Sequence, residues 1–103
     1  MANGLQGRSK PASNTATTVF TATTPIVVTL NATNCSASNA DVATISVAPS
    51  GVTPGDEHRI ESATDLPAKG VIERTGIVLN TGDFVQVLSG SGYVAFNVWG
   101  VEL

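Results

Sequence analysis

The sequence predicts an all-β protein: an antiparallel β-sandwich preceded by an extended N-terminal arm. Aliphatic and β-branched residues are abundant, while charged residues make up 13% of the chain against about 25% in a typical protein. Several segments alternate apolar and polar residues with a period of two, which is typical of half-buried strands. Turn-forming clusters separate them at intervals of about 8–12 residues, and no segment has the spacing of an amphipathic helix.

The arm is predicted for residues 1–17, and the sandwich domain for residues 18–103. The first segment has no apolar periodicity, and Gly4, Gly7 and Pro11 stand among small polar residues. We therefore expect the arm to be disordered alone and to become ordered only against a partner.

The first half of the sandwich contains four predicted strands. The second of them alternates clearly, with Ile26, Val28 and Leu30 pointing to one face. The fourth is short and charged, which suits a sheet edge. The four segments are residues 18–22, 25–36, 41–49 and 57–62.

The second half contains three predicted strands, which we expect to form a meander. Their ranges are residues 71–79, 84–89 and 93–103. The connections 80–83 and 90–92 carry glycines that suit hairpin turns. In the last strand, Val94, Phe96 and Val98 share one face and Trp99 lies on the other. The pattern leaves immunoglobulin-like and jelly-roll-like sandwiches equally open.

The charge pattern excludes some partners. The net charge is -3, and a nucleic-acid surface needs clustered Lys and Arg instead. Residues 1–40 carry only Arg8 and Lys10, whereas all eight acids lie from Asp41 onward. No apolar run approaches the ~20 residues of a membrane span, and the first residues lack the apolar core of a signal peptide. We expect neither a nucleic-acid nor a membrane partner.

Residues for catalysis or metal binding are scarce. Cys35 is the single cysteine and His58 the single histidine, so they offer one Cys–His pair and too few ligands for zinc. Asp56, Glu57 and Glu61 form the densest acidic group, which we interpret as a solvated edge. We expect no catalytic residue, no cofactor and no metal.

Two aromatic residues of the last strand are candidates for binding. Tyr93 and Trp99 share a face but lie roughly 20 Å apart along a strand, too far for one sugar subsite. Trp99 is either an interface anchor or a core residue.

The segment 70–83 contains adjacent opposite charges at Glu73 and Arg74. Alternation places the two side chains on opposite faces of a strand, so they cannot form one catalytic pair. At least one of them must face inward, pair with a neighbouring strand or lie at a subunit contact. Gly76 indicates a bulge or a close backbone approach.

Residues 60–103 resemble a family of short virion proteins of tailed bacteriophages. The matching motifs are Ile60-Glu61, Leu66-Pro67-Ala68, Gly70, Glu73-Arg74-Thr75-Gly76, Gly82-Asp83 and Val98-Trp99-Gly100-Val101-Glu102. Residues 18–48 match loosely, and residues 1–17 fall outside the resemblance.

The resemblance implies a non-enzymatic structural protein of the virion, assembled in the host bacterial cytoplasm. A decoration or cement protein on the capsid exterior is favoured, with the major capsid protein or other virion proteins as partners. A tail- or fibre-associated or receptor-binding module is the alternative. We expect a homo-oligomer, for which a trimer is one candidate.

The residues expected to contact a partner come from the arm and from two strands. They are Leu5, Arg8, Lys10, Arg74 and Trp99. If the arm serves only for binding, deleting residues 1–15 lowers affinity for particles and leaves the domain's melting temperature nearly unchanged.

Overall fold

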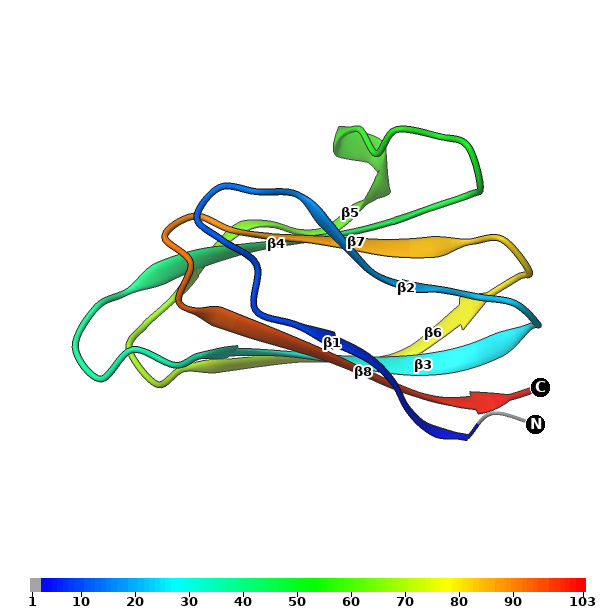
Figure 1. Ribbon diagram of the computed structural model, residues 1–103, viewed down its shortest axis with the longest axis horizontal. Helices are drawn as coiled ribbons and strands as arrows, with labels where there is room; N and C mark the ends of the chain where they lie inside the picture. The colour runs from blue at the N-terminus through cyan, green and yellow to red at the C-terminus, as the bar shows by residue number, and fades with distance from the viewer. Residues whose placement is uncertain (1–2) are drawn as a thin grey trace.

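The computed structural model describes residues 3–103 and shows two four-stranded antiparallel sheets packed face to face (Figure 1). The strands of this part of the chain are β1 (Gly4–Ser9), β2 (Thr17–Thr21), β3 (Ile26–Asn34), β4 (Asp41–Ala48), β5 (Arg59–Leu66), β6 (Val71–Leu79), β7 (Phe84–Ser89) and β8 (Val94–Glu102). A short 3₁₀ turn, η1 (Asp56–His58), precedes β5. The predicted all-β sandwich is confirmed.

The strand order is that of a jelly roll. Sheet A has the order β1-β8-β3-β6, and sheet B has the order β2-β7-β4-β5. Among the described strands, only β4 and β5 are neighbours both in sequence and in one sheet, so six of the seven connections pass between the sheets. This order of two interleaved Greek keys identifies the jelly roll among the two predicted sandwiches.

The core lies between the two sheets and follows the predicted alternation. In β3, Ile26, Val28 and Leu30 are buried, and in β8 Val94, Phe96 and Val98 are buried. Sheet B contributes further buried side chains to the same core, including Ile45, Leu66, Val85 and Val87. Gly100 also faces inward, where an added Cβ would lie 2.7 Å from the Ile26 side chain.

The predicted meander of the last three strands is wrong. Strands β6 and β8 belong to sheet A and β7 belongs to sheet B, although the bounds of β6 and β7 match the predicted ranges. The connections 80–83 and 90–92 are therefore arches between sheets. Their glycines, Gly82 and Gly92, do have positive φ. Tight arches use the same glycine conformation as hairpins, so the turn residues do not distinguish them.

The predicted short strand 57–62 is shifted. Its first two residues lie in η1, and β5 continues to Leu66, four residues beyond the predicted end. A bulge explains the difference, since Ser62 and Ala63 together oppose Thr44 of β4. Ala63 has a φ of 45°, and its backbone N–H donates to Thr44 Oγ1 at 2.9 Å.

The expectation of a disordered arm is also wrong for most of its length. Strand β1 pairs with β8 along the edge of sheet A, from Gly4 opposite Gly100 to Ser9 opposite Phe96. Gly7 is required by packing, because a Cβ there would collide with the Val19 carbonyl oxygen of β2. Pro11 is buried, and the Asn14 N–H donates to the Ser89 carbonyl at 2.8 Å. Residues 1 and 2 lie outside the described residues.

The opposite side of the sandwich is joined by an ion pair between edge strands. Arg74 of β6 reaches across from sheet A and binds the carboxylate of Glu61 on β5 of sheet B. Glu61 is 5% exposed and also accepts a hydrogen bond from Thr64 Oγ1 at 2.6 Å. Beside the pair, Gly76 has a φ of 70° and forms the predicted bulge with Thr75. Arg74 therefore pairs across to another strand, as one of the sequence-based interpretations proposed.

Deleting residues 1–9 is expected to destabilise the domain. The deletion removes a hydrogen-bonded edge strand and exposes the edge of β8, so we expect a loss of about 2 kcal/mol and a fall in melting temperature of roughly 10 °C. Thermal unfolding followed by circular dichroism measures the change. An unchanged melting temperature would restore the interpretation of these residues as an independent arm.

Arg74→Met is expected to lower the free energy of unfolding by about 2 kcal/mol. Removing one member of a buried pair typically costs about 3–5 kcal/mol, but the Arg74 side chain is half exposed and water replaces part of the interaction. Urea denaturation measures the loss. Arg59→Met is the matched control, because the Arg59–Asp56 pair is exposed and we expect a loss below about 0.5 kcal/mol. Equal losses in the two variants would contradict the bridging role of Arg74.

Candidate interaction surface

The two residues of the candidate Cys–His pair lie far apart. Cys35 is exposed in the loop that follows β3, and His58 belongs to η1 in the connection between β4 and β5. Figure 1 shows these two connections at opposite ends of the sandwich. The fold therefore does not bring the thiol and the imidazole together.

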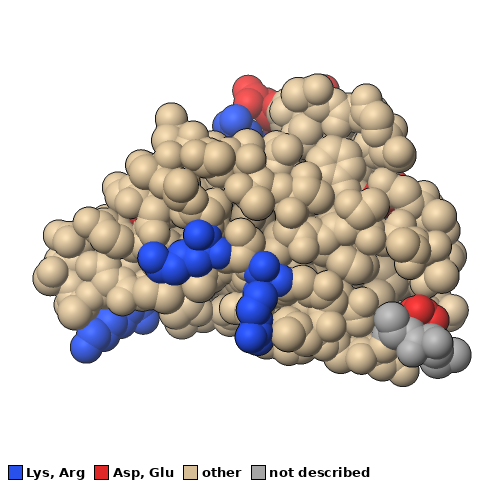
Figure 2. Space-filling model, viewed as in Figure 1, with Lys and Arg blue, Asp and Glu red and all other residues tan. Residues whose placement is uncertain are grey.

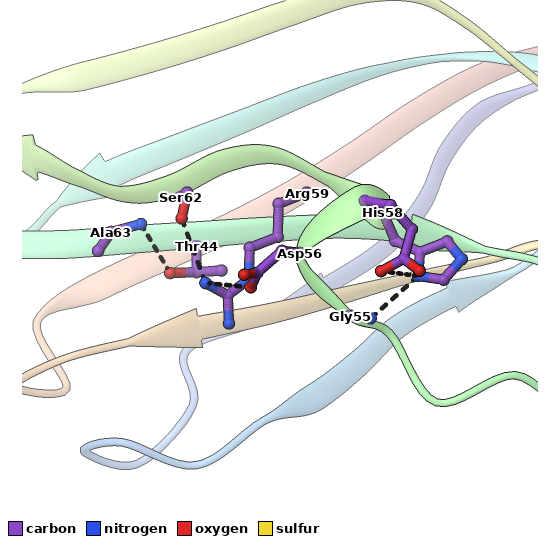
Figure 3. A network of polar contacts seen from close by, with 8 residues as sticks. Thr44, Gly55, Asp56, His58, Arg59, Ser62 and Ala63 are labelled. Atoms are coloured by element: carbon purple, nitrogen blue, oxygen red, sulfur yellow. Dashed lines mark hydrogen bonds and ion pairs between the residues drawn. The ribbon is translucent and has the colours of Figure 1, made fainter.

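The polar contacts around η1 are local (Figure 3). His58 Nδ1 accepts a hydrogen bond from the Gly55 N–H at 2.9 Å, which closes the turn. Arg59 contacts Asp56 at 3.4 Å and Ser62 Oγ at 3.2 Å. Glu61 points away from this group into the sandwich edge, so the predicted acidic cluster is divided. Within residues 3–103, no three His, Cys, Asp or Glu side chains come together as a metal site.

Asp41 and Ser89 form a buried polar pair that sequence reasoning missed. Ser89 Oγ donates to Asp41 Oδ2 at 2.6 Å and accepts hydrogen bonds from the N–H groups of Gly92 and Val94. Ser89 is fully buried and Asp41 is 6% exposed. Because the serine hydroxyl is saturated and inaccessible, the pair joins β4 to the arch between β7 and β8 and leaves no reactive oxygen.

The environment of Asp41 favours its charged form. Burial acts to raise the pKa of Asp41, but hydrogen bonds from Ser89 Oγ and from three backbone N–H groups outweigh it and lower the pKa below its ordinary value. The three backbone donors belong to Val42, Tyr93 and Ser91. Two of these donors, Ser91 and Tyr93, belong to the arch between β7 and β8. The carboxylate therefore stabilises the connection that leads from sheet B to sheet A.

The outer face of sheet A, here called the interaction surface, carries most of the exposed large apolar residues of the described chain. In its apolar half, Val27 of β3 lies between Val101 of β8 and Val78 of β6 in one row across the strands. Beside this row, Leu5 of β1 lies opposite Trp99 of β8. Trp99 is 39% exposed, and Val78 is 62% exposed. Val27, Thr29, Trp99 and Val101 line a shallow hollow of about 260 Å³. Exposed apolar residues that adjoin across several strands make this face a candidate contact site.

The other half of the interaction surface is polar and nearly neutral. One row runs across all four strands of sheet A, from Arg8 through Asn97 and Asn31 to Glu73. Arg8 Nε donates to Asn97 Oδ1 at 3.1 Å. In the next row, Ala95 and Thr33 lead to Val71, which is 57% exposed. The opposite charges of Arg8 and Glu73 thus lie at opposite edges of the surface.

Four of the five residues predicted to contact a partner lie on or beside the interaction surface. Leu5, Arg8 and Trp99 belong to it, so a core position for Trp99 is excluded. Lys10 follows β1 and lines, with Arg8 and Ala95, a smaller hollow of about 140 Å³. Arg74 lies elsewhere, in the ion pair between the sheets. Figure 2 shows the side of the molecule that carries β1 and β2, where isolated basic groups lie on a largely uncharged surface.

Sequence reasoning missed the contributions of Val27, Val78 and Val101, and for Glu73 it left a subunit contact as one of several interpretations. Alternation does place Val27 on the outward side of its strand. The combination of these residues into one surface depends on the register of β3 with β6 and β8, which no local pattern specifies.

Comparison with known proteins returned no match to any family model, curated protein or solved structure. In the described residues, no helix has the length and apolar character needed to cross a membrane.

Asp41→Asn is expected to lower the free energy of unfolding by about 2 kcal/mol at neutral pH, because an amide cannot accept all four hydrogen bonds of the carboxylate. The lowered pKa makes this difference depend on pH. The contribution of Asp41 is complete above the unfolded-state pKa of about 4 and is lost as the pH falls through the lower folded-state pKa.

Urea denaturation at several pH values measures this effect. The gap between wild type and Asp41→Asn should be largest above pH ~5 and narrow toward pH ~2. Asp65→Asn is the control, because Asp65 is an exposed carboxylate at the same end of the sandwich. A gap that is constant with pH would contradict the stabilising role of the ionised carboxylate.

Proposed function

We propose that this protein is a non-enzymatic structural component of a bacteriophage particle, a decoration or cement protein that binds and stabilises the capsid exterior. The partners in this proposal are the major capsid protein and neighbouring copies of the chain. The proposal joins the resemblance of residues 60–103 to virion proteins with the properties of the interaction surface.

The observation that carries the proposal is the exposed apolar half of the interaction surface. The outward face of an antiparallel sheet is usually solvated and polar. Here it presents Trp99, Leu5 and Val78 to solvent beside a nearly neutral polar row. Such a surface is stable in an assembly that covers it, and large aromatic residues concentrate the energy of such contacts.

The same geometry gives less support to a receptor- or glycan-binding module. Tyr93 is half-buried before β8, and its hydroxyl lies 3.4 Å from the Asn39 amide. It is therefore separated from Trp99 by the polar row, and the two rings do not form one platform. Jelly rolls occur in both viral capsid and lectin domains, so the fold alone favours neither function.

The proposed mechanism is mechanical. A protein bound across the junction between capsomers resists separation, because its contacts break only when the capsomers move apart. Many symmetry-related copies add avidity to a modest individual contact. The rigid sandwich, with both sides joined by contacts between edge strands, transmits such a load without needing a ligand.

Electron microscopy of purified particles with the chain labelled tests the location. Label distributed over the capsid shell is the expected result, with more particles surviving heat or low salt than in particles lacking the protein. Label confined to the tail would replace the proposal by the tail-associated alternative. Absence of the chain from particles would reject a virion function.

Trp99→Thr is expected to lower occupancy on particles at least about tenfold, because it removes the largest exposed aromatic contact. Ile60→Thr is the matched control, since Ile60 is exposed to a similar extent, at 37%, but lies on β5 of sheet B. Occupancy is measured by quantifying the bound chain after adding each variant to particles that lack it. Equal occupancy of both variants would exclude the interaction surface as the contact.

A further inference from the structure

We propose that the interaction surface binds a second copy of this chain, with the two sheets A packed face to face about a two-fold axis that runs parallel to their strands. This inference rests on the assembly role proposed above and names the partner of the surface.

The charged residues of the surface define the direction of the axis. Arg8 lies on the edge strand β1 and Glu73 on the opposite edge strand β6, at the two ends of one row. A two-fold axis parallel to the strands reverses the order of the strands in the second copy. It leaves the position of each residue along the strand direction unchanged. Arg8 of one copy then faces Glu73 of the other, and the same contact forms a second time by symmetry.

The alternative two-fold axis, perpendicular to the strands within the sheet plane, is unfavourable. With the polar rows aligned, it places β1 opposite the second copy's β1 and brings the two Arg8 side chains together, and likewise the two Glu73 side chains. The same alignment places the apolar half of each copy against the residues beyond the polar row of the other copy. Moving the axis into the apolar half brings the apolar residues together but leaves Arg8 and Glu73 of both copies outside the contact. Like charges placed opposite each other oppose association, so the parallel axis is the one that the surface supports.

The apolar residues agree with the same axis. Because height along the strands is kept, the half that contains Trp99, Val101 and Val27 faces the same half of the second copy. Val101 then lies opposite Val27 and Val27 opposite Val101, since these residues are paired on the two central strands β8 and β3. Two sheets packed in this aligned manner, about 30° apart, are a common arrangement in β proteins.

The groups needed for the charged contact are available. Glu73 is exposed, and neither Glu73 nor Arg8 forms an ion pair with any residue of the described chain. The hydrogen bond from Arg8 Nε to Asn97 Oδ1 holds the guanidinium over the surface, while its terminal nitrogens remain for a carboxylate.

The size of the surface predicts moderate affinity. Four strands spaced by ~4.8 Å and about nine residues long, at ~3.3 Å per residue, cover a flat area of roughly 600 Å². Two such faces bury about 1,200 Å² together, which is the lower limit for specific interfaces. We therefore expect a dimer with a dissociation constant in the micromolar range.

The test is the oligomeric state of the purified full chain across a concentration series, measured by analytical ultracentrifugation. Wild type should pass from monomer to dimer, and Trp99→Thr should weaken the dimer at least about thirtyfold. Ile60→Thr, on sheet B, should dimerise like wild type. Circular dichroism melting confirms that each variant is folded, which is expected because the substituted side chains are exposed.

Charge reversal tests the direction of the axis. Arg8→Glu and Glu73→Arg should each weaken self-association about tenfold or more, because each places like charges opposite one another twice. An equimolar mixture of the two single variants should associate, since both contacts then join opposite charges. The double variant Arg8→Glu/Glu73→Arg should also recover the dimer.

Four results would overturn the inference: a chain that is monomeric at millimolar concentration, a trimer, a dimer unaffected by Trp99→Thr, or single variants that do not recover on mixing. These results are separable from the particle experiment. A dimer that is absent from particles would reject the virion function alone, and a monomer that decorates capsids would reject the dimer alone.

Discussion

The passage of the chain between two sheets is the constraint on which the structure depends. Six of the seven connections among the described strands cross from one sheet to the other, so nearly every strand pairs with strands distant in sequence. Each crossing exposes backbone groups that need partners. The Asp41 carboxylate supplies acceptors for the arch after β7, and the buried Asn34 amide donates to the Leu66 carbonyl at 3.0 Å, which ties the end of β3 to the end of β5.

The two long sides of the sandwich are closed in different ways. Close backbone contact at Gly7 and Val19 joins β1 to β2, and the Glu61–Arg74 pair joins β5 to β6. Inward-pointing charges and bulges on edge strands prevent another strand from adding to the sheet. Both devices occur on β5 and β6. With the edges protected in this way, the area left for contact with another molecule is a sheet face. Association through that face leaves the hydrogen bonding within each sheet unchanged.

The features that were predicted correctly from the sequence are those that depend on the alternation of side chains along a strand. The facing of β3 and β8, the bounds of β6 and β7, and the opposite orientations of Glu73 and Arg74 follow from side chains that point to opposite faces at successive positions. Features that depend on distant pairing were not predictable. Gly7 suggested a flexible segment. In the structure a glycine is needed there because β2 packs against the backbone at this position. Glu61 was interpreted as part of a solvated edge, because the arginine that binds it lies 13 residues away in sequence. The role of Asp41 had no local signal, because one of its hydrogen-bond donors lies 52 residues away.

The position of β8 has a consequence for synthesis. This strand lies between β1 and β3 in sheet A, although it is synthesised after both of them. On the ribosome, β1 and β3 therefore emerge long before the strand that joins them. Sheet A cannot be completed until residues 94–102 have left the exit tunnel, because β1 joins β3 only through β8. Until then the edges of β1 and β3 that β8 will cover remain accessible to chaperones.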